Sequence, residues 1–181
     1  MTDDFFSPRA GGDAQRVRAD ALGEPGKRRF RLLVVLDNET HIIWLEKQQL
    51  EALGIAIEQL LDQLPERPLS LDSSFSVAEF DDDTRSQFRA GRMELGFDVA
   101  NDRLIIAAHD IQQEESEASP SLSIRITRTQ AVDLSAEAAR VVAAGRPRCP
   151  MCGELIEPGE VHVCPEQNGH LPLSFDDEFL A

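Results

Sequence analysis

Residues 149–153, Cys-Pro-Met-Cys-Gly, followed by residues 162–165, His-Val-Cys-Pro, form the stretch around which this chain is organised. All three cysteines of the 181-residue chain and one of its four histidines lie in these two segments. Thiolate sulfurs and imidazole nitrogens are the donors that suit tetrahedral Zn²⁺. The sequence therefore predicts a single-metal zinc knuckle that ends a small domain.

The spacing within each segment identifies the expected zinc ligands. Cys149 and Cys152 are in C-x-x-C spacing, so an intervening turn can direct both sulfurs to one point. Gly153 supplies the conformational freedom that such a turn needs. His162 and Cys164 are two residues apart, so on an extended segment both side chains leave the same face. Each segment thus contributes two ligands.

The cysteines and the fourth ligand have alternative interpretations. His170, in Cys-x₅-His spacing after Cys164, is the alternative to His162 as the fourth ligand. A disulfide would leave one of the three cysteines over, and a redox C-x-x-C usually opens a helix, whereas this one follows a predicted helix. Cysteines without a metal are the third possibility. With four protein ligands no coordination position stays open, so the zinc site is expected to be structural rather than catalytic.

The composition excludes several classes of partner. A formal net charge of −15 argues against non-specific nucleic-acid binding and against an anionic membrane surface, because both depend on Lys and Arg. No apolar run approaches the length of a membrane span. Residues 1–6 lack the basic region of a signal peptide, and reduced cysteines in a metal site fit the cytoplasm. We therefore expect a cytoplasmic protein without nucleic-acid or membrane partners.

Basic residues are concentrated near the N-terminus. Residues 9–31 hold seven Arg and Lys against three acidic residues, whereas residues 32–181 hold eleven against twenty-eight. We expect the basic segment to pack along the acidic body or to be solvated. A binding role for Lys27, Arg28, Arg29 and Arg31 is the alternative. Trp44, the only tryptophan, is expected to pack rather than to bind.

Hydrophobic periods predict an α+β fold. The expected strands are residues 16–22, 30–36, 40–45, 88–99, 104–111 and 122–126, with a short edge strand at 75–80. Residues 47–64 carry apolar side chains at helical spacing, and residues 128–144 follow a capping box formed by Thr127 and Gln130. Each helix has one apolar stripe to bury, so we expect an antiparallel sheet covered by two helices, with the zinc knuckle at the C-terminus.

The predicted elements and the zinc knuckle divide the chain into four parts. We expect a mobile N-terminus at residues 1–15, an α+β domain at 16–145, the zinc knuckle at 146–170 and an acidic tail at 171–181. Within the knuckle, residues 157–160, Glu-Pro-Gly-Glu, are typical of the turn that would fold one pair of ligands onto the other.

Several short stretches carry a resemblance to a known family. They are residues 23–26 (Gly-Glu-Pro-Gly), 45–49, 88–91 (Phe-Arg-Ala-Gly), 141–147, 149–153, and 162–165 with Asn168 and Gly169. Together they resemble an uncharacterised bacterial family, the domain of unknown function DUF3090, over most of residues 16–170. The chain departs from that family in a longer stretch at 65–87 and at Glu166. It also has His170 where the family commonly has an aromatic residue, which favours His162 as the ligand.

The resemblance implies no activity. It implies that genes for histidine-phosphatase-like and kinase-like proteins often lie near the genes of this family.

Catalytic motifs are missing from the sequence, since neither G-x-S-x-G nor H-E-x-x-H occurs. His41 with Asp37, or His109 with Asp110, could supply acid–base groups, but structural roles are expected. We therefore expect a non-catalytic binding or adaptor module with a protein partner. The alternative is an enzyme, linked to phosphate metabolism, whose active site cannot be recognised from the sequence. The sequence identifies neither the partner nor the oligomeric state.

Overall fold

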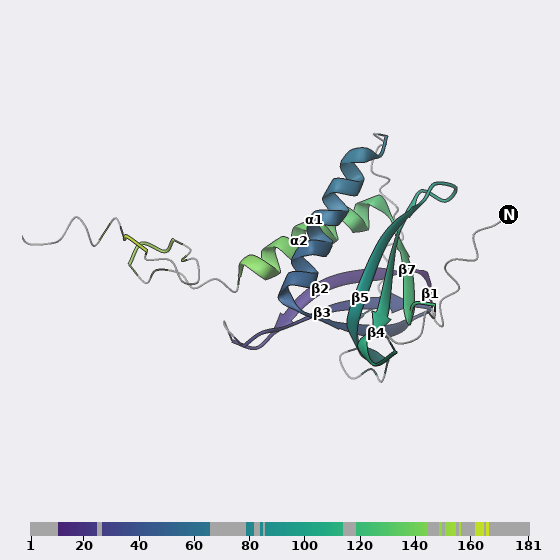
Figure 1. Ribbon diagram of the computed structural model, residues 1–181, viewed down its shortest axis with the longest axis horizontal. Coiled ribbons are helices and arrows are strands. Elements are labelled where there is room, and N and C mark those ends of the chain that lie inside the picture. The colour runs from purple at the N-terminus through teal and green to yellow at the C-terminus, as the bar shows by residue number, and fades with distance from the viewer. Residues whose placement is uncertain are drawn as a thin grey trace, which may run out of the picture. The chain divides into compact units, whose positions relative to one another are not determined.

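A seven-stranded sheet and two helices form the larger part of the computed structural model (Figure 1). The structure describes residues 11–24, 27–65, 79–81, 84, 86–113, 119–144, 149, 151–154, 156, 162–164 and 166. The chain divides into two compact units, Met1–Ala144 and Gly145–Ala181. The predicted turn at 157–160 and the predicted tail at 171–181 lie outside the described residues, as does most of the predicted edge strand at 75–80.

The sheet contains every strand that alternation predicted over described residues. Its order is β1-β7-β6-β5-β4-β3-β2. The strands are β1 (Gly11–Asp13), β2 (Arg16–Leu22), β3 (Arg29–Leu36), β4 (Glu39–Leu45), β5 (Gln87–Asp98), β6 (Arg103–Asp110) and β7 (Leu122–Ile126). Each end of β2 to β7 coincides with the predicted bound or lies one residue from it, and turn residues at positive φ, Asn38 and Asp102, stand directly before the starts of β4 and β6.

The prediction of a purely antiparallel sheet is wrong, because the sheet is mixed. β4 pairs with β5 in parallel, with Trp44 opposite Arg89, and β1 pairs with β7 in parallel. Two neighbouring strands that run parallel need a long crossover connection, and α1 (Lys47–Gln63) lies in that connection. The predicted helix therefore joins two neighbours in the sheet, which periodicity alone does not reveal.

Strand β1 also corrects an expectation. Residues 11–13, which we assigned to a mobile N-terminus, pair with β7. The chain then bends, because the N–H of Ala14 donates to Arg125 at 2.8 Å and the N–H of Gln15 donates to Val35 at 2.9 Å. β1 and β2 thus form one bent segment that supplies both edges of the sheet, because β1 pairs with β7 and β2 pairs with β3. The sheet is curled so that its two edges meet at this bend.

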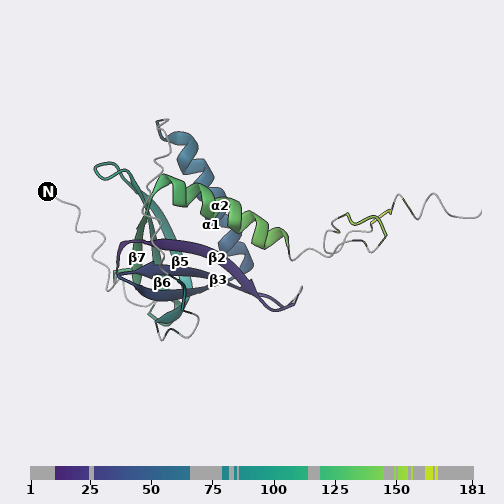
Figure 2. The same ribbon diagram turned by 180° about the vertical axis from the view of Figure 1, so that it is seen from behind.

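Both helices cover the same face of the sheet (Figures 1 and 2). α1 crosses α2 (Arg128–Ala143), and their apolar stripes meet alternate residues of the strands in one core. The largest core side chains include Leu32, Ile43, Leu50, Ile57, Leu104, Ile106, Ile124 and Leu134. The predicted capping box is confirmed, since Thr127 Oγ1 accepts from the N–H of Gln130 at 3.1 Å and Gln130 Oε1 accepts from the N–H of Thr127 at 2.9 Å.

Two of the stretches that carry the family resemblance meet in space. The Oε1 of Gln49, in the first turn of α1, accepts from the N–H of Glu46 at 2.8 Å. Its Nε2 donates to the carbonyls of Ala90 and Gly91 in β5, at 3.2 and 3.1 Å. The β5–β6 register shifts at this point, between Ala90 and Arg92. One glutamine side chain therefore ties the start of α1 to an irregularity in the neighbouring strand.

Neither described helix is long and apolar enough to cross a membrane.

Candidate metal centre

The four predicted ligands come together in the C-terminal unit. Donor atoms of Cys149, Cys152, His162 and Cys164 all lie within 4.8 Å of one another. The Sγ atoms of Cys149 and Cys164 are 3.7 Å apart, and Cys152 Sγ is 3.2 Å from His162 Nε2. Each close pair joins one residue of the first segment to one residue of the second. The cluster is therefore a candidate metal-binding site built from both segments.

A tight turn brings the first two cysteines to one side. The N–H of Gly153 donates to the carbonyl of Cys149 at 2.9 Å, and the N–H of Cys149 donates to the carbonyl of Glu154 at 2.8 Å. Gly153 has a φ of 72°, in the left-handed region that favours glycine. A glycine directly after Cys152 therefore suits the turn that reverses the chain.

The cluster is partly shielded from water. Cys149 and Cys164 are buried, with exposed fractions of 7% and 4%, whereas Cys152 and His162 are half-buried. Two sulfurs at about 2.3 Å from a tetrahedral metal would lie about 3.8 Å from each other, and a sulfur and an imidazole nitrogen about 3.5 Å apart. The observed 3.7 and 3.2 Å separations are close to these values. The residues present therefore fit one tetrahedral metal ion.

The thiols would oppose one another's ionisation without a cation. Hydrogen bonds from the backbone N–H groups of Cys152 and Met151 lower the pKa of the Cys149 thiol to about 6. The N–H of Glu154 acts in the same direction on Cys152, but burial and the neighbouring sulfurs outweigh it and raise the pKa of Cys152 to about 11. A bound divalent cation would remove this conflict, because a coordinating thiol is deprotonated.

The alternative fourth ligand, His170, lies outside the described residues, as do Gly145 and Pro147. The disulfide alternative receives no support from the described cysteines. Cys149, Cys152 and Cys164 are all free, and the 3.7 Å between the sulfurs of Cys149 and Cys164 is far longer than a disulfide bond.

The two histidines considered as acid–base groups contact partners other than the expected aspartates. His41 Nδ1 lies 2.6 Å from Ser86 Oγ, and burial lowers the pKa of His41 despite the opposing charge of Glu39. His109 lies 3.2 Å from Arg92 Nη2 and 3.4 Å from a carboxylate oxygen of Glu94. Within the described residues, the structure brings neither histidine to the partner that the sequence suggested.

Sequence reasoning missed one group of side chains. Trp44, which was expected to pack rather than to bind, contacts side chains of the same chain: the parallel pairing of β4 and β5 places Arg89 opposite it, and Arg29 and Arg31 lie over its ring. The sequence analysis named Arg29 and Arg31 as possible binding residues, but local patterns do not indicate that Trp44, or Arg89 more than fifty residues further along the chain, lies beside them.

Comparisons with known proteins identify a family but no characterised relative. Neither the curated proteins nor the solved structures gave a match to this chain. A family described as a protein of unknown function, DUF3090, matches residues 12–164. The match begins within β1 and ends at Cys164, so it includes the sheet, both helices and all four residues of the candidate metal centre. Since it spans most of the sequence, the chain belongs to the DUF3090 family.

Proposed function

We propose that the Cys/His cluster holds one Zn²⁺ in a closed structural site, and that the protein is a non-catalytic binding module of the cytoplasm with a protein partner. The observation that carries the metal part is the convergence of four donor atoms within 4.8 Å. The described first unit has its own sheet, helices and apolar core. The metal would therefore stabilise the C-terminal unit rather than the whole fold.

The donor set favours zinc over other metals. Three thiolates and one imidazole are soft and borderline ligands, which suit Zn²⁺ and argue against Mg²⁺ or Ca²⁺, because those ions prefer oxygen. Cys₃His is a common ligand set of structural zinc sites, and the reduced thiols that it needs fit the cytoplasm.

The structural role follows from the number of protein ligands. Four side chains fill a tetrahedron, so no position is left for a water molecule or a substrate. Met151 and Val163, each next to a ligand in the sequence, have exposed side chains. Exposed apolar side chains held by a metal-stabilised turn are suited to contact a protein. These features support a binding module more than a catalytic centre.

Metal analysis tests the zinc site. Protein purified under reducing conditions without chelators should contain about one zinc ion per chain. Cys152→Ser and Cys164→Ser should each lower that content strongly, whereas Met151→Ser, in the same turn, should retain it. Replacement of zinc by Co²⁺ should give the visible absorption of a tetrahedral thiolate site. Metal content near zero, or equal content in Cys152→Ser and Met151→Ser, would contradict the zinc site.

Affinity capture tests the binding role. The tagged chain, recovered from its native host and analysed by mass spectrometry, should bring down one protein in stoichiometric amount. The tagged Cys152→Ser variant shows whether the C-terminal unit contributes to that contact. A chain that is recovered alone under gentle conditions would contradict a binding module.

A further inference from the structure

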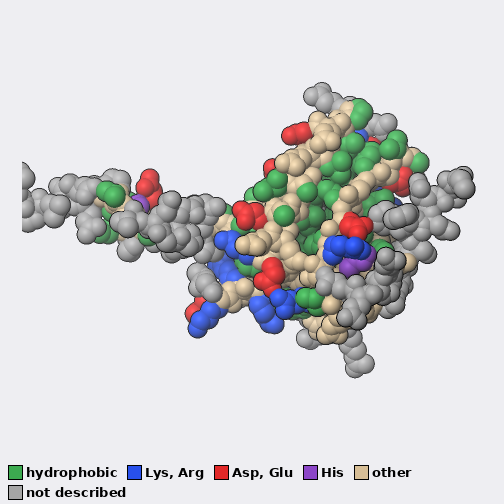
Figure 3. Space-filling view, in the orientation of Figure 1, with side chains coloured by type: hydrophobic (Ala, Val, Ile, Leu, Met, Phe, Trp, Pro, Cys, Tyr) green, Lys and Arg blue, Asp and Glu red, His purple; other side chains and the backbone are tan. Residues whose placement is uncertain are grey.

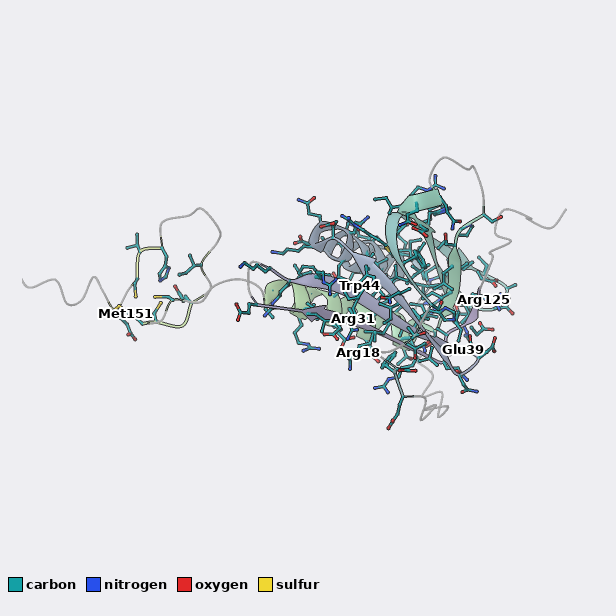
Figure 4. All side chains as sticks on the ribbon, turned by 90° about the horizontal axis from the view of Figure 1, so that it is seen from below. Arg18, Arg31, Glu39, Trp44, Arg125 and Met151 are labelled. Carbon is teal, nitrogen blue, oxygen red and sulfur yellow. The ribbon has the colours of Figure 1, made fainter. Side chains whose placement is uncertain are left out.

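The sheet face that points away from both helices carries arginines around one tryptophan. Alternate residues of β2 and β3 point to this face, since their neighbours Ala19, Phe30 and Leu32 lie in the core beneath the helices. We call it the arginine face and define it by Arg16, Arg18, Arg29, Arg31, Trp44 and Arg89. Figure 4 shows Trp44, Arg31 and Arg18 one after another across β4, β3 and β2.

Trp44 is the centre of one half of this face. The Cζ of Arg29 lies 4.5 Å from the centroid of the Trp44 ring, and the Cζ of Arg31 lies 5.9 Å from it. The indole Nε1 donates to Gln87 Oε1 at 2.9 Å, which fixes the orientation of the ring. Arg89, directly opposite Trp44 in the sheet, pairs with Glu46 and is 58% exposed. The Trp44 ring is therefore held beside Arg29 and Arg31 by contacts within the chain.

The arginine face contrasts with the charge of the rest of the chain. It collects five arginines, whereas the whole chain has eighteen basic residues and a net charge of −15. In Figure 3, Lys and Arg side chains gather toward the end of the first unit where β2 and β3 meet. Arg31 is only 6% exposed and pairs with Asp20, but Arg29 is exposed and makes no ion pair within the described residues. Unbalanced positive charge therefore remains at the surface beside Trp44.

The other half of the face, formed by Arg16 and Arg18, already contacts an aromatic side chain of the same chain. The ring of Phe80 lies 4.6 Å from the Cζ of Arg16 and 5.3 Å from that of Arg18. Phe80 stands between Glu79 and Asp81, and the N–H of Asp81 donates to Thr40 Oγ1 of β4 at 2.9 Å. A short segment with one aromatic and two acidic residues thus lies along Arg16 and Arg18 within the same molecule.

We infer that the half of the arginine face formed by Arg29, Arg31, Trp44 and Arg89 binds a short acidic segment of a partner protein that carries an aromatic residue. The aromatic side chain would pack on Trp44 and the exposed guanidinium of Arg29, as Phe80 packs on Arg16 and Arg18. Its neighbouring carboxylates would pair with Arg29 and Arg89. This inference identifies a surface for the proposed binding role and rests on that role, but not on the metal site.

A protein segment fits this face better than a nucleic acid. Single strands combine base stacking with many phosphate contacts along an extended basic groove. Here the basic residues are confined to β2, β3 and β5 of one sheet, and Asp20 and Glu46 lie among them. A net charge of −15 on the chain repels a long polyanion, whereas a few carboxylates within one short segment meet only the local cations.

A peptide titration tests the inference. The probe is the pentapeptide Glu-Phe-Asp-Asp-Asp, which is the sequence of residues 79–83. Because Trp44 is the only tryptophan, its fluorescence reports on occupancy of this half of the face. We expect a saturable change that weakens as salt is added. Arg29→Gln should weaken binding about threefold, the double variant with Arg89→Gln about tenfold, and a peptide with Ala in place of Phe about threefold.

Arg140→Gln is the matched control, because it removes one exposed arginine from α2 on the opposite side and should leave the affinity unchanged. Equal affinity for the Arg29→Gln and Arg140→Gln proteins would overturn the inference. So would an affinity lowered by Arg16→Gln but not by Arg29→Gln, which would place the peptide on the other half. Oligo-deoxythymidine that binds more tightly than the peptide and is lost in Arg29→Gln would assign the face to nucleic acid.

The zinc content of each variant separates this inference from the proposed metal site. Arg29→Gln should retain about one zinc ion per chain, because Arg29 lies outside the candidate metal centre. Zinc-loaded protein that does not bind the peptide would overturn the inference and leave the metal site intact. Metal-free protein that still binds the peptide would overturn the zinc site alone.

Discussion

The Sγ atom of Cys149 lies 3.7 Å from the Sγ atom of Cys164, although the two residues are 15 positions apart in the chain. Cys152 and His162 form a second close pair, with 3.2 Å between Sγ and Nε2. Both pairs connect the first segment to the second. Loss of a single thiol therefore removes a connection between the segments rather than a contact within one of them.

Substitution of Cys152 should loosen the C-terminal unit and leave the sheet unchanged. Structural zinc contributes folding free energy to the segment that it holds. In Cys152→Ser, amide hydrogen exchange should therefore accelerate at Cys149 and Gly153, whose hydrogen bonds close the turn. Protection from exchange should persist in β3 and β6, which belong to the apolar core of the first unit. Met151→Ser is the control and should exchange like the unmodified protein. Loss of protection throughout the chain would show that the metal centre is integral to the whole fold.

Gly153 should be required for its backbone conformation rather than for lack of space. Its φ is 72°, and a Cβ built there would meet no atom within 4 Å. Gly153→Ala should therefore weaken zinc binding by about 1 kcal/mol, which is roughly fivefold, whereas Gly153→Asn should cost less because asparagine tolerates this region. Competition with a coloured zinc chelator measures both. A larger loss for asparagine than for alanine would show that side-chain size, and not backbone conformation, is the constraint at this position.

Local patterns predicted most of the fold. The alternation of Leu122, Ile124 and Ile126 indicated β7, and Thr127 with Gln130 indicated the start of α2, because both signals arise between residues that are close in the chain. The four candidate metal ligands were predictable for the same reason. Cysteine and histidine at these spacings have few other uses together.

Long-range pairing was not predictable from those patterns. Trp44 and Arg89 lie opposite each other only because α1 and the residues after it bring β5 back beside β4 in parallel. Alternation shows which face a side chain takes but not which strand lies beside it. The antiparallel prediction failed at this step.

Asp20 should contribute stability that is lost in acid. Burial raises the pKa of Asp20, but hydrogen bonds from Arg31 and from the N–H of Ala21, with the charge of Arg18, outweigh this and lower the pKa below its ordinary 3.8. The contribution is therefore present above that ordinary value and is lost as pH falls through the lower folded-state value.

Urea unfolding of Asp20→Asn measures that contribution. Near neutral pH the variant should be less stable by about 1 kcal/mol, since the ion pair is partly screened by water. The difference should shrink as the pH falls from the ordinary carboxyl value of 3.8 through the lower pKa that Asp20 has in the folded protein. Asp133→Asn, an exposed carboxylate of α2, is the control and should have little effect. A difference that grows toward acid would mean that the sign of the pKa shift is wrong.

The crossing of α1 and α2 should depend on the small size of Gly54. This glycine is buried in the middle of α1, where an added Cβ would lie 3.3 Å from the Cβ of Ala138 in α2. Gly54→Leu should force the helices apart and destabilise the protein by about 2–3 kcal/mol. In Gly54→Ala, the gain in helix propensity of about 1 kcal/mol should offset the tight contact, so the net change should be small.

Ala52→Leu is the matched control, because Ala52 is exposed on the same helix and the same side chain is added there without a facing helix. Urea or thermal unfolding should rank the variants with Gly54→Leu far below the other two. A Gly54→Leu protein as stable as Ala52→Leu would mean that the helices can separate at no cost. The close approach at Gly54 would then have no part in holding α1 and α2 over the sheet.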